Sequence, residues 1–338
     1  MSLATEDDGR SSLPVGEASP RRATLLPRTT SGQPQAPAKL TRRGQRRGAL
    51  RNWVGFEAAR VEFVQTEGRS PLDPAVLRDE VAGPGLPWRQ LDVVDETGST
   101  NADLIARGNA GSDIAGAVLL AEYQTAGRGR HGRSWSAPAR SQISMSVGVG
   151  IGTVPPTAWG WLPLLAGVAT ADTLFNVCDI QVGLKWPNDV LVGDRKLAGI
   201  LAEVAAPAGV IVLGLGLNVT MRADEVAHPA ATSLTMLGSS ATDRNVLVRS
   251  LLTALGSRIE QWTSSGGADD ALIADYLRYS RTIGTRVKAD MPGDRQIIGV
   301  ARSIDEMGRL QIDTGSTLFT VSAGDITHLR PLPGMAAG

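Results

Sequence analysis

Residues 185–219 read KWPNDVLVGDRKLAGILAEVAAPAGVIVLGLGLNV, and this stretch predicts the centre of a β-sheet. The turn residues Gly193-Asp194 separate two apolar runs, a pattern typical of a β-hairpin. The following run at 210–219 is almost continuously apolar, as expected for a strand that is covered on both faces. We therefore expect a hairpin at 190–204 and a central strand at 210–219.

Further strands and helices are predicted on both sides of this stretch. Residues 157–176 carry apolar side chains at helical spacing and predict a buried helix, so we expect its tryptophans, such as Trp161, in the core. Strands are expected at 88–94, 117–121, 143–149 and 182–186. Helices are expected from Pro71 and Pro74 through Glu80, from Thr100 to Gly108, at 243–262 and at 268–279.

The pattern changes at Thr285 to five short alternating segments. Turns such as Pro292-Gly293-Asp294 separate them, which predicts a small separate β-barrel. We therefore divide the chain into a basic tail at 1–50, a main domain at 51–280 and a C-terminal barrel at 281–332.

Composition narrows the class of protein. The formal net charge of the 338 residues is +0, which gives no overall attraction to nucleic acid or membranes. The single cysteine, Cys178, excludes an intramolecular disulfide framework and indicates a reducing cytoplasm. Three widely spaced histidines argue against a zinc site. No run of eighteen apolar residues and no signal-like N-terminus is present, so we expect neither a membrane span nor secretion.

The N-terminal tail is basic and poor in large apolar residues. Residues 1–52 contain ten Lys and Arg against four Asp and Glu. Such a segment cannot bury enough surface to offset its ordering entropy, so we expect disorder. A nucleic-acid arm, a transit peptide and a simple unstructured extension all remain open. We expect no helix-turn-helix domain ahead of the main domain.

A loop rich in glycine and arginine is predicted within residues 121–135, AEYQTAGRGRHGRSW. Glycines allow the backbone to approach a ligand closely, and guanidinium groups donate paired hydrogen bonds to carboxylate or phosphate. GRGRHG also matches the dinucleotide-binding pattern G-x-G-x-x-G, but no helical pattern follows it and no acidic residue lies at the required distance. A nucleic-acid-binding RG segment would need a longer repeat. The stretch therefore favours a structured anion-binding loop.

Two further stretches carry candidate site residues. Lys185 and Asp189 flank a proline in KWPNDV, either as an edge strand and turn or as a phosphate-facing cation and a carboxylate placed for Mg²⁺. Lys196 begins the next strand, and Gly199 leaves room for a ligand above it. At the helix start GSTN, Thr100 and Asp103 fit a capping box, and the polar side chains there serve either as caps alone or also as ligand contacts.

Taken together, these motifs resemble those of the biotin protein ligases. The resemblance rests on GSTN (98–101), EYQTAGRGRHGRSW (122–135), KWPNDV (185–190), KLAGIL (196–201) and GLGLNV (214–219), and it extends over about 88–330. The sequences of these motifs are most similar to those of actinobacterial members. His131 departs from the commonest family pattern, which has another arginine there. The N-terminal DNA-binding domain of the regulatory members is not visible in this sequence.

The resemblance implies an α+β fold in which helices flank a mixed β-sheet, the class II synthetase-like fold of biotin and lipoate ligases, with an SH3-like barrel at the C-terminus. It also implies a reaction at 51–280. Biotin and ATP form biotinyl-5′-AMP, and a lysine of a carboxylase biotin carrier domain then takes the biotinyl group. Since cation placement supplies most of the catalysis, no nucleophilic side chain is needed.

The resemblance also implies roles for individual residues. The catalytic residues would be Lys196, Arg128 and Arg130. Biotin would contact Ser99, Thr100, Asn101, Gln124, Arg128, Gly129, Arg130 and Lys196. ATP and the adenylate would contact Arg133, Trp135, Lys185, Asn188, Asp189 and Asn218. ATP would come with Mg²⁺, for which Asp189 is the candidate ligand, and no redox cofactor is implied.

Two other functions remain as alternatives. A lipoate or octanoate ligase of the same fold would need a longer apolar slot and fewer polar contacts far from the carboxyl group. A biotin-responsive binding module without catalysis would have no need of Lys196 and both arginines. We also expect the Gly/Arg loop to be mobile without ligand, because its glycines permit opening as well as fit.

Overall fold

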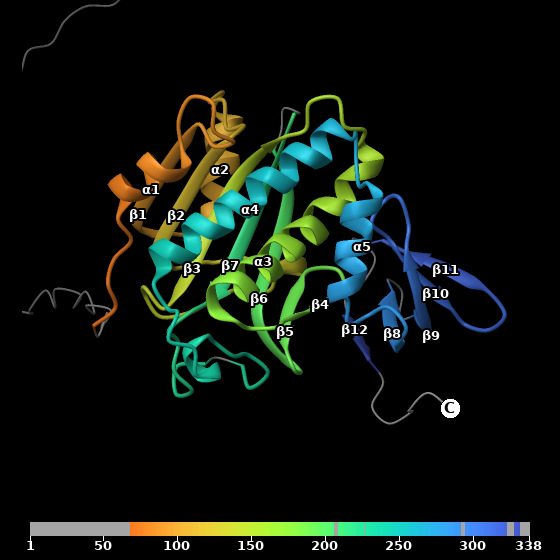
Figure 1. Ribbon diagram of the computed structural model, residues 1–338. Helices are drawn as coiled ribbons and strands as arrows, with labels where there is room; N and C mark the ends of the chain where they lie inside the picture. The colour runs from red at the N-terminus through yellow and green to blue at the C-terminus, as the bar shows by residue number, and fades with distance from the viewer. Residues whose placement is uncertain (1–67, 206–208, 227, 292–294, 323–327, 332–338) are drawn as a thin grey trace, which may run out of the picture. The chain divides into compact units, whose positions relative to one another are not determined.

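The computed structural model describes residues 68–205, 209–226, 228–291, 295–322 and 328–331, all within one compact unit (Figure 1). The predicted tail at 1–50 and the first residues of the predicted main domain lie outside the described residues. The helices are α1 (Pro74–Val81), α2 (Thr100–Asn109), α3 (Leu162–Cys178), α4 (Arg244–Ser264) and α5 (Asp270–Tyr279), with 3₁₀ turns η1 (Arg130–Gly132), η2 (Pro156–Trp161) and η3 (Thr235–Leu237).

A seven-stranded mixed sheet forms the main domain, in the order β1-β2-β3-β7-β6-β5-β4. Its strands are β1 (Gln90–Thr97), β2 (Ala117–Gln124), β3 (Gln142–Gly150), β4 (Gly183–Lys185), β5 (Asp189–Val192), β6 (Arg195–Ala205) and β7 (Val210–Asn218). Only β1 and β2 are parallel neighbours; the other pairs are antiparallel. The predicted hairpin is confirmed as β5–β6, and the predicted central strand is β7, the middle strand of the sheet.

The two faces of this sheet are covered differently. α3 and α4 cross one face, where Ile143, Met145 and Val147 of β3 join the large hydrophobic core (Figure 1). Strand alternation turns Ser144 and Ser146 to the opposite face. That face carries a much smaller apolar cluster under α2 and leaves the rest of its area to polar side chains and glycines. The sequence prediction of an α+β fold with a helix-flanked mixed sheet is confirmed.

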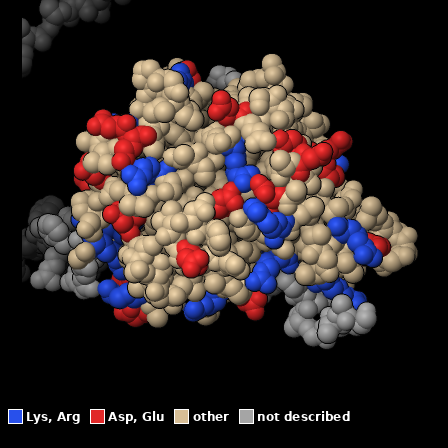
Figure 2. Space-filling model, viewed as in Figure 1, with Lys and Arg blue, Asp and Glu red and all other residues tan. Residues whose placement is uncertain are grey.

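The helix at α3 belongs to the core. The segment Pro156–Cys178 is long and apolar enough to cross a membrane by length and composition, but 67% of its most apolar window is buried in the fold, and no other segment of the described residues passes that test. Trp161 is fully buried, which confirms its predicted core position. Charged side chains of both signs are interspersed over the face that α3 and α4 cover (Figure 2).

A five-stranded antiparallel sheet follows α5, in the order β11-β10-β9-β8-β12. Its strands are β8 (Arg286–Met291), β9 (Arg295–Ile304), β10 (Leu310–Asp313), β11 (Leu318–Val321) and β12 (His328–Pro331). Two core tryptophans fasten it to the main domain: Trp161 Nε1 donates to the Asp305 carbonyl at 3.1 Å and Trp186 Nε1 to the Gly308 carbonyl at 3.0 Å. The five predicted C-terminal strands are therefore present and packed against the main core.

Candidate functional site

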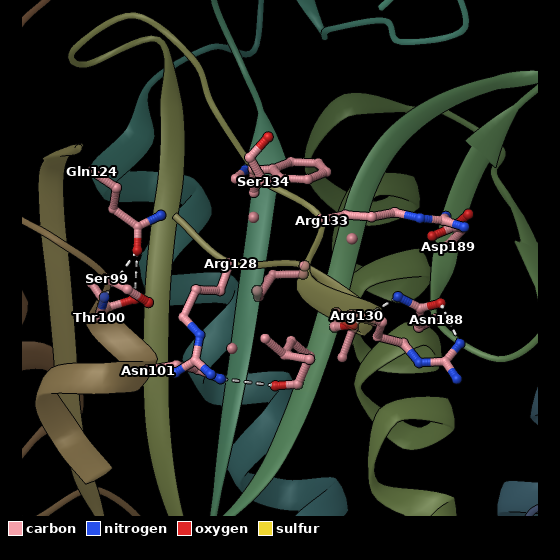
Figure 3. Close-up of a pocket in the computed structure, with 18 of the residues that line it drawn as sticks. Ser99, Thr100, Asn101, Gln124, Arg128, Arg130, Arg133, Ser134, Asn188 and Asp189 are labelled. Atoms are coloured by element: carbon pink, nitrogen blue, oxygen red, sulfur yellow. Dashed lines mark hydrogen bonds between the residues drawn. The ribbon is translucent and has the colours of Figure 1, made fainter. Parts of the chain in front are cut away.

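A cavity of about 150 Å³ opens on the polar face of the large sheet (Figure 3). The start of α2, the end of β2, the Gly/Arg loop and strands β5, β6 and β7 supply its walls. Most of the residues predicted from the sequence line it: Ser99, Thr100, Asn101, Gln124, Arg128, Gly129, Arg130, Arg133, Trp135, Asn188, Asp189 and Lys196. Segments far apart in the sequence thus meet at one place.

The first wall is a buried polar network at the start of α2. The Thr100 amide and hydroxyl donate to Gln124 Oε1 at 2.9 and 3.2 Å. The Ser146 hydroxyl lies 2.7 Å from Thr100 Oγ1 and 2.6 Å from Asn101 Oδ1. Thr100, Asn101, Gln124 and Ser146 are all buried. Because each group holds the next, this wall is in place before any ligand arrives.

The predicted capping box is wrong by one residue. Ser99, not Thr100, is the N-cap of α2, and its side chain accepts from the Ala102 amide. Asp103 accepts a hydrogen bond from the Thr97 hydroxyl instead of closing a capping box. The shift has a physical reason: the Thr100 hydroxyl is already engaged with Gln124 on the neighbouring strand, so the adjacent serine supplies the cap.

Glycines form the floor of the cavity on β6 and β7. A Cβ built at Gly214 would collide with the Asn101 side chain, and one at Gly216 would collide with the Trp135 ring. A Cβ at Gly199 would lie 3.1 Å from both Lys196 Nζ and the Trp135 ring. The space predicted above Gly199 is therefore real, and Lys196 and Trp135 lie next to it.

Trp135 lies on this floor, at the end of the Gly/Arg loop. Its indole nitrogen donates to Gln142 Oε1 at 2.7 Å. Lys196 Nζ lies 5.3 Å from the ring centroid, close enough for a cation–π contact. The ring thus presents an aromatic surface beside the main cation of the site.

The Gly/Arg loop folds back on itself. The Gly129 amide donates to the Arg133 carbonyl at 2.7 Å, and His131 takes a left-handed conformation with φ 56°. After η1 the chain continues in extended form towards β3, so no helix opens at Gly132. The dinucleotide-binding interpretation of GRGRHG is excluded by this geometry, because such a site needs a helix N-terminus at the third glycine.

Two of the three arginines in the loop, Arg128 and Arg130, are held differently. Arg128 pairs with Glu203, with Nη2 and Oε1 3.1 Å apart, and remains half exposed. Arg130 reaches Asn188 Oδ1 at 3.5 Å through Nη1, while its buried Nη2 has no hydrogen-bond partner among the described residues. Burial lowers the pKa of Arg130, the Asp189 carboxylate opposes this change, and Arg133 adds to it. A buried guanidinium nitrogen without a partner is suited to receive an anion.

A further cation, Lys196, is the second residue of β6. Its Nζ lies 2.6 Å from Asp189 Oδ1 on the adjacent strand. The neighbouring Asn188 donates through Nδ2 to the Ile200 carbonyl at 2.9 Å, which fixes the turn that carries both residues. No group of three or more His, Cys, Asp or Glu side chains that could enclose a metal ion occurs among the residues that the structure describes.

Two predicted site residues do not line the cavity. Lys185 lies on β4 beside a small separate hollow that it shares with Asn188 and Asp189. Asn218 is buried at the end of β7, where its Nδ2 donates to the Thr232 carbonyl at 2.9 Å. Asn218 thus holds the segment after β7 rather than facing the cavity.

Sequence reasoning missed three residues that shape the site: Gln142, which holds Trp135; Ser146, which joins Thr100 and Asn101; and Glu203, which engages Arg128. For Glu203 a signal was present. It follows Gly199 by four positions on one strand, so alternation places both on the same face.

Comparisons with known proteins agree with this architecture. The model of the biotin/lipoate A/B protein ligase family matches residues 99–218, and that of the biotin protein ligase C-terminal domain matches residues 282–329. The chain is similar in fold to a biotin protein ligase from Aquifex aeolicus, solved in complex with biotin and ATP. That match has a TM-score of 0.63 and 24% identity over 72% of this chain and 100% of the other.

Two curated relatives are similar over most of the chain. The bifunctional ligase/repressor BirA of Escherichia coli is 34% identical over 70% of this chain and 72% of its own length. A biotin–[acetyl-CoA-carboxylase] ligase of Mycobacterium tuberculosis is 56% identical over 78% of this chain and 97% of its own length. With that similarity, the two family matches and the shared fold, the chain belongs to the biotin protein ligase family.

Proposed function

We propose that this protein is an ATP-dependent biotin ligase, which joins biotin to a lysine of a carboxylase biotin carrier domain through biotinyl-5′-AMP. One observation carries the proposal: Arg128, Arg130, Arg133 and Lys196 line the same cavity as the buried polar network of α2. A cavity with a preformed polar wall and several cations fits a substrate with a polar ring and a carboxylate tail, together with a phosphate-bearing second substrate.

The polar wall would bind the ureido end of biotin. Ser99, Thr100, Asn101 and Gln124 offer hydroxyl and amide groups that can both donate and accept. Because their mutual hydrogen bonds fix their positions, ligand binding costs little ordering entropy at this end of the cavity.

The cations would serve the first chemical step. A biotin carboxylate oxygen attacks the α-phosphorus of ATP, and the bond from that phosphorus to the bridging oxygen of pyrophosphate breaks. Arg128, Arg130 and Lys196 would bring the two anions together and stabilise charge on the phosphoryl oxygens, while the Gly129 backbone lies against the carboxylate. In the second step the acceptor lysine amine attacks the acyl carbon, AMP leaves, and an amide bond remains.

The nucleotide would lie towards β5 and the loop end. Arg133, Asn188 and Asp189 line this part of the cavity, and Trp135 offers an aromatic surface for the adenine. Lys185 and Asn218 lie outside the cavity wall, so their proposed roles on the ATP side are indirect, through Asp189 and through the segment after β7.

Mg²⁺ would enter with ATP. The ion usually binds one or two protein carboxylates together with phosphate oxygens, and the Asp189 carboxylate at the cavity wall fits that arrangement once Lys196 turns to the substrate. The ion would screen the charge of the phosphates. A cytoplasmic location would give the enzyme both ATP and its carboxylase acceptor.

The polar wall favours biotin over the fatty-acyl alternatives. A lipoate or octanoate chain has no polar ring to set against Thr100, Asn101 and Gln124, so it would displace water from these buried groups without forming new hydrogen bonds to them. The decisive experiment is ATP–pyrophosphate exchange with biotin, lipoate and octanoate side by side. Exchange with biotin alone is expected. Exchange with lipoate or octanoate but not biotin would refute the proposal, and biotin binding without exchange would identify a binding module.

A further inference from the structure

Glu203 lies two residues beyond the KLAGIL motif and contacts Arg128 and Asn101, which both line the cavity. The substrate roles proposed above do not include it. It follows Gly199 and Leu201 on the polar face of β6. Its side chain is only 22% exposed although it carries a charge. A carboxylate this close to a site for two anionic substrates should weaken their binding unless it has a specific task.

Both oxygens of this carboxylate are engaged by site residues. Oε1 lies 3.1 Å from Arg128 Nη2, and Oε2 accepts from Asn101 Nδ2 at 2.9 Å. Figure 3 shows Arg128 extending from the Gly/Arg loop towards Asn101 at the start of α2. Glu203 therefore ties the loop to the polar wall across the cavity.

The contact with Glu203 occupies Nη2 of the Arg128 guanidinium, the group that would meet the substrate anion. A guanidinium binds one carboxylate best through its paired donors, so substrate and Glu203 compete for it. Arg130 differs, because its buried Nη2 has no partner among the described groups. In the ligand-free site, Arg130 can thus receive an anion directly, whereas Arg128 must first separate from Glu203.

We propose that Glu203 is an internal anion that holds Arg128 in the ligand-free enzyme and releases it when the substrate carboxylate or the adenylate arrives. It keeps the loop docked to β6 between turnovers, in contrast to the mobility that the glycines predict for the ligand-free loop, and it sets the affinity at which ligand replaces it. Glu203 is thus a positioning residue, which acts through Arg128. This inference rests on the proposed function for the identity of the ligand, but not for the tether itself.

The first test is the binding of biotin to Glu203→Gln by titration calorimetry. Glutamine keeps an oxygen for Asn101 but removes the charge that competes for Arg128. Since a half-exposed ion pair is weak, biotin should bind about fivefold more tightly. Glu80→Gln is the matched control, because it breaks a surface pair with Arg249 on α4 at 2.8 Å, and it should bind as the wild type does. Unchanged or weaker binding by Glu203→Gln overturns the proposal.

A double-mutant cycle separates the ion pair from a general charge effect. In an Arg128→Ala background, Glu203→Gln should no longer change biotin affinity, because the held guanidinium is gone. The same tightening in that background would overturn the proposal, since it would mean that Glu203 repels the ligand directly.

A second readout needs no ligand. Trypsin cleavage after Arg128, Arg130 or Arg133, identified by fragment mass, should be several-fold faster in Glu203→Gln than in wild type, because the loop loses its tether. An equal cleavage rate overturns the proposal. Failure of the wild type to bind biotin would instead refute the proposed function, and the cleavage result would still decide the role of Glu203.

Discussion

The start of α2 and the Gly/Arg loop face each other across the same cavity, yet they are built on different principles. At α2 the polar groups are buried and hydrogen-bonded to one another. In the loop, Arg128 is half exposed and paired with a carboxylate. Buried hydrogen bonds fix geometry, whereas half-exposed ion pairs can be exchanged at little cost. The wall therefore suits recognition of a group that stays unchanged in the reaction, and the loop suits the reacting anion.

The largest effect is expected when Lys196, the main cation of the site, is removed. Lys196→Ala should lower biotin-dependent ATP–pyrophosphate exchange about 100-fold or more, because one preorganised donor to the transition state is lost. Wild-type exchange in this variant would contradict the assignment of Lys196 to the reacting anions.

The buried arginine of the loop is the next largest test. Arg130→Gly should release biotinyl-5′-AMP at least about tenfold faster, because a charged hydrogen bond to the adenylate is lost. The freed adenylate should then label bystander proteins, which a streptavidin blot would detect. A variant that retains the adenylate as the wild type does would show that Arg130 has no part in holding it.

A substitution in the polar wall should lower the stability of the fold more than a substitution in the loop. Thr100→Val keeps the shape but removes the hydroxyl between Gln124 and Ser146, so it should weaken biotin binding about tenfold and lower stability by about 1–3 kcal/mol. Arg128→Ala is the matched loop variant: its half-exposed pair should cost at most about 1 kcal/mol of stability. Calorimetry and thermal unfolding would measure both, and equal losses of stability would contradict the comparison.

The smallest expected effect concerns an ion pair outside the site. Burial acts to raise the pKa of Glu225, but the hydrogen bond from Arg69 and the further interactions with Arg222 outweigh it and lower the pKa below its usual 4.5. A carboxyl group whose pKa is lower in the folded than in the unfolded protein stabilises the fold at pH values above its unfolded pKa. This contribution is lost as the pH falls through the folded pKa. Glu225→Gln should therefore lower Tm by about 2 °C at pH 7 and by less at pH 3.5. An equal shift at both pH values would contradict this.

Much of the fold could be predicted because its signals are local. The hairpin of β5 and β6, the central strand β7 and the core helix α3 follow from apolar periodicity and turn residues, which depend on neighbouring positions only. The cap of α2 could not be placed to the residue, because Ser99 and Thr100 are equivalent cap formers and a side chain from β2, Gln124, decides between them.

The sequence by itself determined the strands, the Gly/Arg loop without a following helix, and the set of cations that the cavity brings together. Only the tertiary structure decided what each cation faces: Asp189 for Lys196, Glu203 for Arg128, and no hydrogen-bond partner within the described residues for one nitrogen of Arg130. The physical reason is the distance along the chain over which each kind of interaction acts. Periodicity and turn chemistry act over a few residues, whereas these pairings depend on the register of β5 with β6 and on how the loop lies across β6, which packing of the whole sheet sets.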